Sequence, residues 1–219
     1  MCAVFYLVFS YLVVGSFIKN YASITAFYIV STYLVVLCNI VSIDIGGSEE
    51  KFPPKPFAPV YQRAKEMGLH LVAHAGEAAG PESIWDAIDY LKVERIGHGV
   101  TAIQDPELVA YLHKRNITVE MCPTSNLRTG VIPSLQKHPI RTFFDNGIRV
   151  TVNTDDPSMF NTDMNNEYLQ LHRQLNFTVS ELFDLTLNAL DSSFLPETQK
   201  LQMHESFMKE YRQLMDDFS

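Results

Sequence analysis

Charged residues are almost missing from the first part of this sequence. Of the 17 basic and 25 acidic side chains, only Lys19 precedes Asp44. The whole chain has 219 residues, of which 19% are charged, fewer than the usual quarter, and its net charge is −8. An acidic chain of this kind excludes nucleic-acid binding through a basic surface as the main function.

Cysteine is also scarce. The three cysteines, Cys2, Cys38 and Cys122, contain no C-x-x-C spacing. The sequence therefore predicts neither a disulfide framework nor a thiolate zinc site. A reducing compartment fits this composition best.

Residues 1–41 form an apolar segment. Two uncharged runs, residues 2–18 and 21–41, are separated by Lys19 and Asn20. Each run is near the lower length limit of a membrane-spanning helix, for which ~20 residues are typical. We expect either a membrane anchor or a segment foreign to the native protein, such as the translated edge of an incomplete gene model. A cleaved signal peptide is disfavoured because no basic residue precedes the first run.

From residue 42 to residue 219 the pattern changes to alternating strands and helices. Helical spacing of apolar residues follows most of the strand-like runs and covers the sequence after Asp155. This alternation predicts a parallel sheet with crossover helices, either a barrel or an open doubly wound sheet. The predicted strands are 41–45, 69–74, 95–98, 117–122 and 149–154, and the predicted helices before Asp155 are 59–67, 81–91, one beginning at Asp105, and 135–146.

Polar residues follow each predicted strand. Because parallel strands direct their carboxyl ends to one edge, these residues are expected to share one site. They are His74 with Glu77, His98, the run CPTSN at 122–126, and Asp155-Asp156, and the pair Gly46-Gly47 closes the first strand.

Each of these residues also has a structural interpretation. His74 and His98 can be ordinary hydrogen-bonded histidines, and Glu77 can be a solvated loop carboxylate. The pair Asp155-Asp156, which precedes Pro157, can cap a helix. Gly46-Gly47 can be a plain tight turn. The five other histidines have no comparable context and are expected to be structural or exposed.

Taken together, the polar residues indicate metal-assisted hydrolysis. The imidazole of His74 and the carboxylate of Asp155 suit a zinc ion, which lowers the pKa of a bound water to ~7. His98 can hold or deprotonate that water, and Glu77 can donate a proton to the substrate. A catalytic zinc normally has at least three protein ligands, so this set of two is incomplete.

The runs VSIDIGGSEE, HAGEAAGPESIWDAI, ERIGHGV, CPTSN and NTDDP resemble the adenosine deaminases, in particular the bacterial type. The resemblance covers residues 42–219. It implies a (β/α)8 TIM barrel that is incomplete here, because the motifs correspond to barrel strands 4–8 and the C-terminal helices. It also implies zinc-dependent hydrolytic deamination of adenosine and 2′-deoxyadenosine to inosine and ammonia, in purine salvage, and a location in the cytoplasm.

The resemblance also implies residue roles. His74 and Asp155 match zinc ligands, Glu77 matches the acid that protonates purine N1, and His98 matches the residue beside the zinc-bound hydroxide. Two further matches concern the substrate: the carboxylate of Asp156 bonds N7, and the backbone amide of Gly47 contacts N3.

Substrate choice within the family stays open at this point. Relatives act on free adenine, AMP or N6-methyl-AMP. AMP enzymes are longer chains, the HAGE run differs in the N6-methyl-AMP type, and adenine-acting relatives often have Ser where this chain has Thr154. These differences favour adenosine, with adenine as the alternative.

The sequence departs from the family because it contains no His-x-His pair, which supplies two more zinc ligands. Only 178 residues remain after residue 41, whereas a complete barrel takes about 200–250. We therefore expect a deaminase whose N-terminal part is not included. The alternative is a membrane-attached, non-catalytic barrel fragment that binds a purine or a protein partner.

Overall fold

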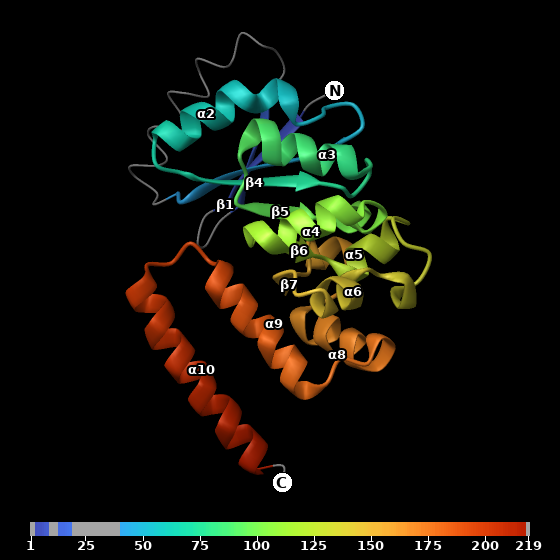
Figure 1. The fold of residues 1–219 in the computed structure, drawn as a ribbon, viewed down its shortest axis with the longest axis vertical. Coiled ribbons are helices and arrows are strands. Elements are labelled where there is room, and N and C mark those ends of the chain that lie inside the picture. Colours follow the sequence, from blue (N-terminus) through green and yellow to red (C-terminus); the bar gives the residue numbers. More distant parts are fainter. Residues whose placement is uncertain (1–2, 9–12, 19–39, 218–219) are drawn as a thin grey trace. The chain divides into compact units, whose positions relative to one another are not determined.

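The computed structural model describes residues 3–8, 13–18 and 40–217 (Figure 1). The chain forms two compact units, of which the first ends at Glu120 and the second begins at Met121. Strand β6 runs across this boundary, and each unit is described by itself.

The first unit is built on a sheet with the strand order β2-β1-β3-β4-β5-β6. The pairs β3–β4, β4–β5 and β5–β6 are parallel, whereas β1 is antiparallel to β2 and to β3. Its strands are β1 (Ala3–Val8), β2 (Val13–Ile18), β3 (Ser42–Gly46), β4 (His70–Ala75), β5 (Arg95–His98) and β6 (Thr118–Met121).

Helices connect the parallel strands of the first unit. Figure 1 shows α2 and the α3–η3 helix along the same side of β4. Leu71, Val72 and Ala73 are successive buried residues of β4, as expected for a parallel strand covered on both faces. The connecting elements are η2 (Lys55–Phe57), α2 (Ala58–Glu66), α3 (Pro81–Asp86), the π-helical turn η3 (Ala87–Leu91), η4 (Val100–Gln104) and α4 (Pro106–Arg115).

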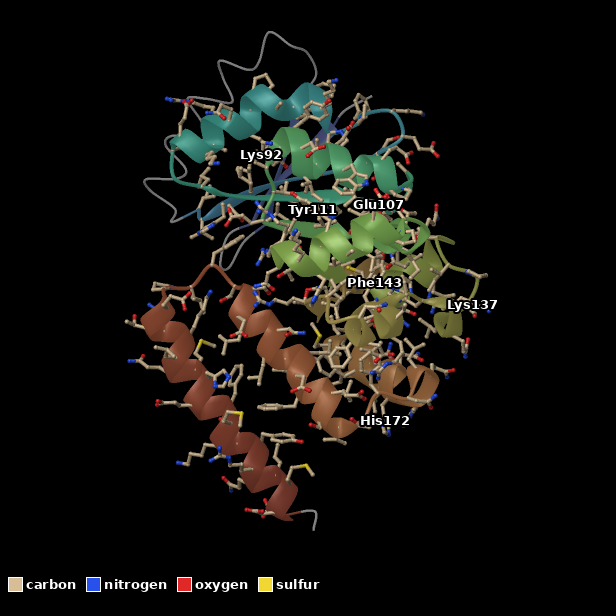
Figure 2. All side chains as sticks on the ribbon, viewed as in Figure 1. Lys92, Glu107, Tyr111, Lys137, Phe143 and His172 are labelled. Atoms are coloured by element: carbon tan, nitrogen blue, oxygen red, sulfur yellow. The ribbon has the colours of Figure 1, made fainter. Side chains whose placement is uncertain are left out.

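The second unit is mainly helical. Asn153, directly after β7, donates a backbone hydrogen bond to the carbonyl of Met121 at 2.9 Å. Helix α9 packs on β7, where the side chain of Asn188 donates to the carbonyl of Val150. Phe143 is fully buried within this unit, whereas Lys137 lies at its edge (Figure 2). The elements are α5 (Pro123–Arg128), η5 (Leu135–Lys137), α6 (Ile140–Asp145), β7 (Val150–Val152), α7 (Pro157–Phe160), α8 (Met164–Leu175), α9 (Val179–Ser192) and α10 (Glu197–Asp217).

The five strands predicted after residue 40 are confirmed as β3 to β7. One predicted helix, 135–146, is wrong as a continuous element: it is divided into η5 and α6 at His138 and Pro139. His138 has φ −67° and ψ 131°, an extended conformation. A residue that precedes proline is sterically disfavoured in the α region, so the helix restarts after Pro139.

The apolar run 2–18 forms β1 and β2 where the structure describes it. Their sequences, AVFYLV and VVGSFI, are rich in the β-branched and aromatic residues that favour strands. The second apolar run lies almost entirely outside the described residues. In the described part of the chain, no helix has both the length and the apolar character needed to cross a membrane. The division of the chain at residues 41 and 42 stays a prediction.

Candidate active site

Three of the predicted site residues meet at the carboxyl ends of β4 and β5. His74 on β4 lies opposite Gly97, and Ala75 lies opposite His98. The ring centroids of His74 and His98 are 5.0 Å apart, and His98 Nε2 is 3.6 Å from Glu77 Oε2. These three residues, which follow two adjacent strands, therefore lie together in the first unit.

His74 is oriented by Asp44, a residue of β3. One carboxylate oxygen of Asp44 accepts from the backbone N–H of His74 at 3.1 Å, and the other lies 2.9 Å from its Nδ1. The Asp44 side chain is only 8% exposed, whereas that of His74 is 31% exposed. A carboxylate at Nδ1 favours the tautomer with hydrogen on Nδ1, which leaves the lone pair of Nε2 for a ligand.

Gly97 makes room for the ring of His74. A Cβ at this position would lie 3.1 Å from His74 Nδ1 and 3.3 Å from His74 Cα, tighter than nine in ten real Cβ contacts. Packing against His74 therefore explains why residue 97 of the strand RIGH is a glycine. It lets the imidazole lie across the neighbouring strand.

His98 is held in an unusual backbone conformation. Its φ is 63°, in the left-handed region that non-glycine residues rarely adopt, and its side chain is 2% exposed. The next residue, Gly99, donates its N–H to the carbonyl of Ala75 at 3.0 Å, which ties this turn to β4. Backbone conformations of this kind persist where the surroundings impose them, and they are frequent at functional sites.

A hollow in the first unit contains the remaining predicted residue of this half. It is lined by the loop after β3, which includes Gly47 and Glu49, by Phe52 and Pro54, and by His74 and Glu77. Gly47 has φ 126°, a conformation that favours glycine. Gly47, His74 and Glu77 thus line the same hollow.

Burial shapes the electrostatics around Asp44. Desolvation raises the pKa of Glu120, and the Arg95 guanidinium, 2.9 Å from Glu120, partly opposes this. Desolvation also raises the pKa of Tyr61 well above its usual value, and Asp44 adds to that shift. The phenol of Tyr61 therefore stays protonated and donates to the carbonyl of Val72 at 2.6 Å.

In the second unit, Asp155 and Asp156 follow β7. Asp155 has φ 58°, again in the left-handed region, and its Oδ2 accepts from the hydroxyl of Ser125 at 2.6 Å. Asp156 stands at the N-cap of α7, yet its side chain makes no capping hydrogen bond. The exposed carboxylate of Asp156 is therefore not used as the cap that the structural interpretation predicted.

The segment that holds Ser125 is fixed by a buried carboxylate. Glu167 on α8 is fully buried, and its two oxygens accept from the backbone N–H of Thr124 and from the hydroxyl of Thr162. Ser125 and Asn126 are also fully buried, and Asn126 bonds the imidazole of His138 at 3.1 Å. His138 is thus a structural histidine, as predicted.

The donor chemistry of the predicted ligands fits zinc. His74 presents an imidazole oriented by a carboxylate, and Asp155 presents a carboxylate oriented by a hydroxyl, the kind of partners that zinc ligands have. Two ligands are fewer than a catalytic zinc requires, and the sequence contains no His-x-His pair to complete the set.

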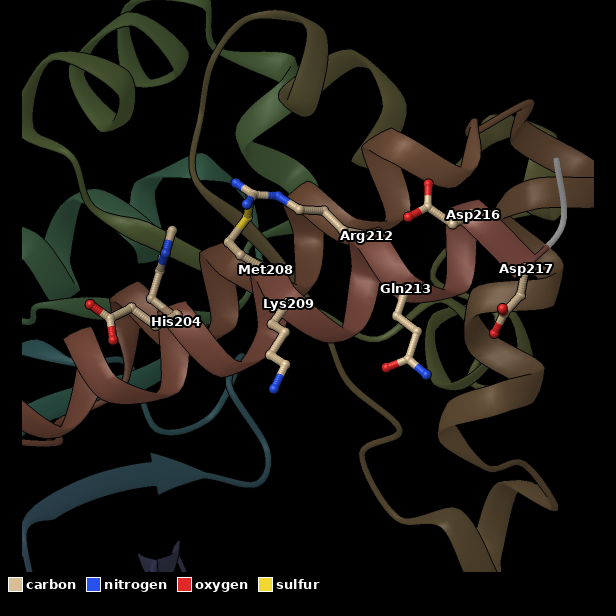
Figure 3. Close-up of a pocket in the computed structure, with 8 residues that line it drawn as sticks. His204, Met208, Lys209, Arg212, Gln213, Asp216 and Asp217 are labelled. Carbon is tan, nitrogen blue, oxygen red and sulfur yellow. The ribbon is translucent and has the colours of Figure 1, made fainter.

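A second hollow lies along α10, and its lining differs from that of the first in the number of charged side chains of both signs (Figure 3). Lys209, Arg212, Asp216 and Asp217 mix both signs of charge along this helix. His204 also lies there, but no predicted site residue does. We therefore place the candidate site at the strand ends.

The adenosine deaminase family model matches residues 35–210, so the chain belongs to this family. An aminodeoxyfutalosine deaminase from Streptomyces coelicolor is 44% identical over 164 residues, which are 75% of this chain and 42% of that protein. An adenosine deaminase from Shewanella loihica is 40% identical over 166 residues, 76% of this chain and 50% of that protein. The chain thus spans about half the length of the curated relatives it matches.

Solved structures of related enzymes also resemble this chain. An adenine deaminase from Arthrobacter aurescens superimposes with a TM-score of 0.81 at 32% identity, covering 86% of this chain and 57% of that one. A zinc-bound amidohydrolase from Burkholderia ambifaria gives 0.79 at 27% identity, covering 88% and 54%. With the strand–helix units described above, this likeness confirms the predicted fold class, an incomplete (β/α)8 barrel.

Sequence reasoning missed the residues that hold the site in place. Asp44, Glu49 and Ser125 were not assigned roles, although Asp44 carried a signal. It is the one charged residue in the run VSIDI, whose other residues are apolar or small. A carboxylate that is buried in such a strand needs a partner. Glu49 and Ser125 carried no such signal, because their partners come from distant parts of the chain.

Proposed function

We propose that this chain is part of a zinc-dependent deaminase that removes an exocyclic amino group from a purine nucleoside by hydrolysis, in purine salvage in the cytoplasm. The observation that carries the proposal is the cluster of His74, Glu77 and His98 at adjoining strand ends, with Asp44 behind His74. Membership in the adenosine deaminase family supports the reaction class.

Each residue then has a role that its surroundings support. Glu77 gives its proton to the purine ring nitrogen, which makes the adjacent amino-bearing carbon electrophilic. The imidazole of His98, 3.6 Å from Glu77, orients water for attack on that carbon and accepts its proton. The amino group then takes the proton from His98 and leaves as ammonia, while the new hydroxyl returns a proton to Glu77 and becomes the carbonyl.

His74 and Asp155 are the residues proposed to hold zinc. When bound, the ion supplies Lewis acidity that makes water nucleophilic at neutral pH. We propose that the further ligands come from a His-x-His pair outside the printed sequence.

The remaining two predicted residues are proposed to bind the substrate. The backbone N–H of Gly47, in the hollow with Glu77, is assigned to N3 of the purine, and the carboxylate of Asp156 to N7. Neither group gives or takes a proton in the reaction. Both hold the ring in the orientation that the proton transfer from Glu77 requires.

Adenosine and 2′-deoxyadenosine are the proposed substrates, because Thr154 stands where adenine-acting relatives often carry Ser. The named relatives support a purine-type substrate without selecting one, since they include aminodeoxyfutalosine, adenosine and adenine deaminases. A comparison of kcat/KM for adenosine, adenine and aminodeoxyfutalosine with the full-length protein decides among them.

Glu77→Gln tests the mechanism. The amide cannot donate a carboxylic proton, so we expect kcat to fall by at least about 100-fold, within the range attributed to acid–base catalysis. Zinc content, measured by atomic absorption, is expected to stay unchanged. The matched control is Glu107→Gln, an exposed residue of α4 (Figure 2). Near-normal turnover of Glu77→Gln would rule out the assigned role.

A further inference from the structure

The loop that carries Glu77 is fixed by a single carboxylate from another loop. Glu49 lies in the segment after β3, and its two oxygens accept hydrogen bonds from four consecutive backbone N–H groups. The donors are those of Gly76 and Glu77, at 2.5 and 3.1 Å, and those of Ala78 and Ala79, at 2.8 and 3.0 Å.

Four convergent N–H groups form a concave anion site of the kind that backbone nests make. Here the bound anion is the carboxylate of Glu49, a residue of the same chain. Hydrogen bonds to an ionised acceptor are roughly twice as strong as those between neutral groups, so the carboxylate is a strong restraint on residues 76–79.

The opposite side of the same turn is held as well. Thr101 donates its hydroxyl to the carbonyl of Ala79 and its backbone N–H to the carbonyl of Gly76, each at 3.0 Å. Gly76 has φ 71°, and a Cβ there would meet the side chain of Ile84 at 2.4 Å. The turn is therefore restrained on both sides, by Glu49 at its four N–H groups and by Thr101 at two of its carbonyl groups.

Glu49 also connects two walls of the hollow. The carbonyl of Ser48 accepts from the backbone N–H groups of Lys51 and Phe52, a turn that presents Glu49 toward residues 76–79. The loop with Gly47 and the loop with Glu77 are thus joined through one side chain.

We propose that Glu49 is a positioning residue that sets the reach of the Glu77 carboxyl toward the substrate. It does so through the backbone of residues 76–79, without contacting the substrate. This inference rests on the proposed function, because it assigns Glu49 an effect only through the proton donor Glu77.

Glu49→Gln removes the charge and one acceptor oxygen, and it directs an NH2 group at backbone donors. We expect amide hydrogen exchange at residues 76–79 of the 219-residue chain to accelerate at least tenfold. The matched control is Glu50→Gln, an exposed neighbour in the same loop, which should leave that exchange unchanged. Unchanged exchange in Glu49→Gln would overturn the restraint itself.

A double-mutant cycle in the full-length protein separates positioning from general destabilisation. We expect Glu49→Gln to lower kcat at least tenfold with Glu77 present, and less than twofold in a Glu77→Gln background. An equal loss of kcat in both backgrounds would overturn the proposal, as would an unchanged kcat with Glu77 present.

The cycle also shows which proposal fails. If Glu77→Gln alone keeps full turnover, the proposed function fails, and the role of Glu49 fails with it. If Glu77→Gln loses turnover while Glu49→Gln keeps it, the role of Glu49 alone is wrong.

Discussion

At the scale of single residues, three of the six predicted site residues are each held by a partner that lies far away in the sequence. Asp44 holds His74, Glu49 holds the loop of Glu77, and Ser125 holds Asp155. The chemically active residue types could be predicted from motif and position, since they follow strands. Their partners could not, because the pairing of separate loops is decided by the folded sheet.

The effect of Asp44 on metal binding is the first residue-scale prediction. Asp44→Asn removes the charge that favours hydrogen on Nδ1 of His74. The substitution therefore lowers the basicity of Nε2 and weakens the orientation of the imidazole ring. We expect zinc affinity of the full-length protein to fall roughly 10–100-fold, as is typical for such partners. Competition with a chelator of known affinity measures this.

Asp89→Asn, at an exposed position of the η3 turn, is the control and should leave zinc affinity unchanged. Circular dichroism checks that Asp44→Asn remains folded. Unaltered zinc affinity in a folded Asp44→Asn variant would contradict the assignment of His74 as a ligand.

At the scale of secondary structure, the strands were predictable because short β-branched runs alternated with helical spacing. The errors arose where one local rule overrode the periodicity. Pro139 divides the helix predicted over 135–146, and α5 begins at Pro123, within a run read only as polar residues after a strand. Pro is favoured at the first helical position, so this signal was present in the sequence.

The contact between α6 and α9 gives a pH-dependent prediction. Arg141 on α6 is the main reason that the pKa of Glu181 on α9 falls to about 2, and the backbone N–H of Thr178 adds to it. Because the folded-state pKa lies below the unfolded one, the contribution to stability is complete above pH ~4.5 and disappears as the pH falls toward 2.

Glu181→Gln isolates this charge, since Gln also suits this position of a capping box. With allowance for solvent screening, we expect the free energy of unfolding to fall by about 1 kcal/mol at pH 7 and to match the parent near pH 2. Urea denaturation at both pH values measures it. Glu197→Gln, whose carboxylate is 83% exposed, is the control and should change it little. An equal deficit at both pH values would contradict the ion-pair explanation.

At the scale of the whole molecule, the family could be predicted from five motifs in order, and the match over residues 35–210 confirms it. The substrate could not be predicted to the same degree, since relatives with similar motifs carry different substrate names. The number of proposed zinc ligands is the main point at which the sequence and the family differ, because the sequence has no His-x-His pair to join His74 and Asp155.

The most direct test of the account is to sequence the 5′ end of the natural transcript. We predict an open reading frame that continues upstream and in frame into a segment with a His-x-His pair, which completes the zinc ligands. A transcript whose coding sequence begins at Met1 would leave the product with only two proposed zinc ligands, His74 and Asp155. That result would contradict the claim that this chain belongs to an active deaminase.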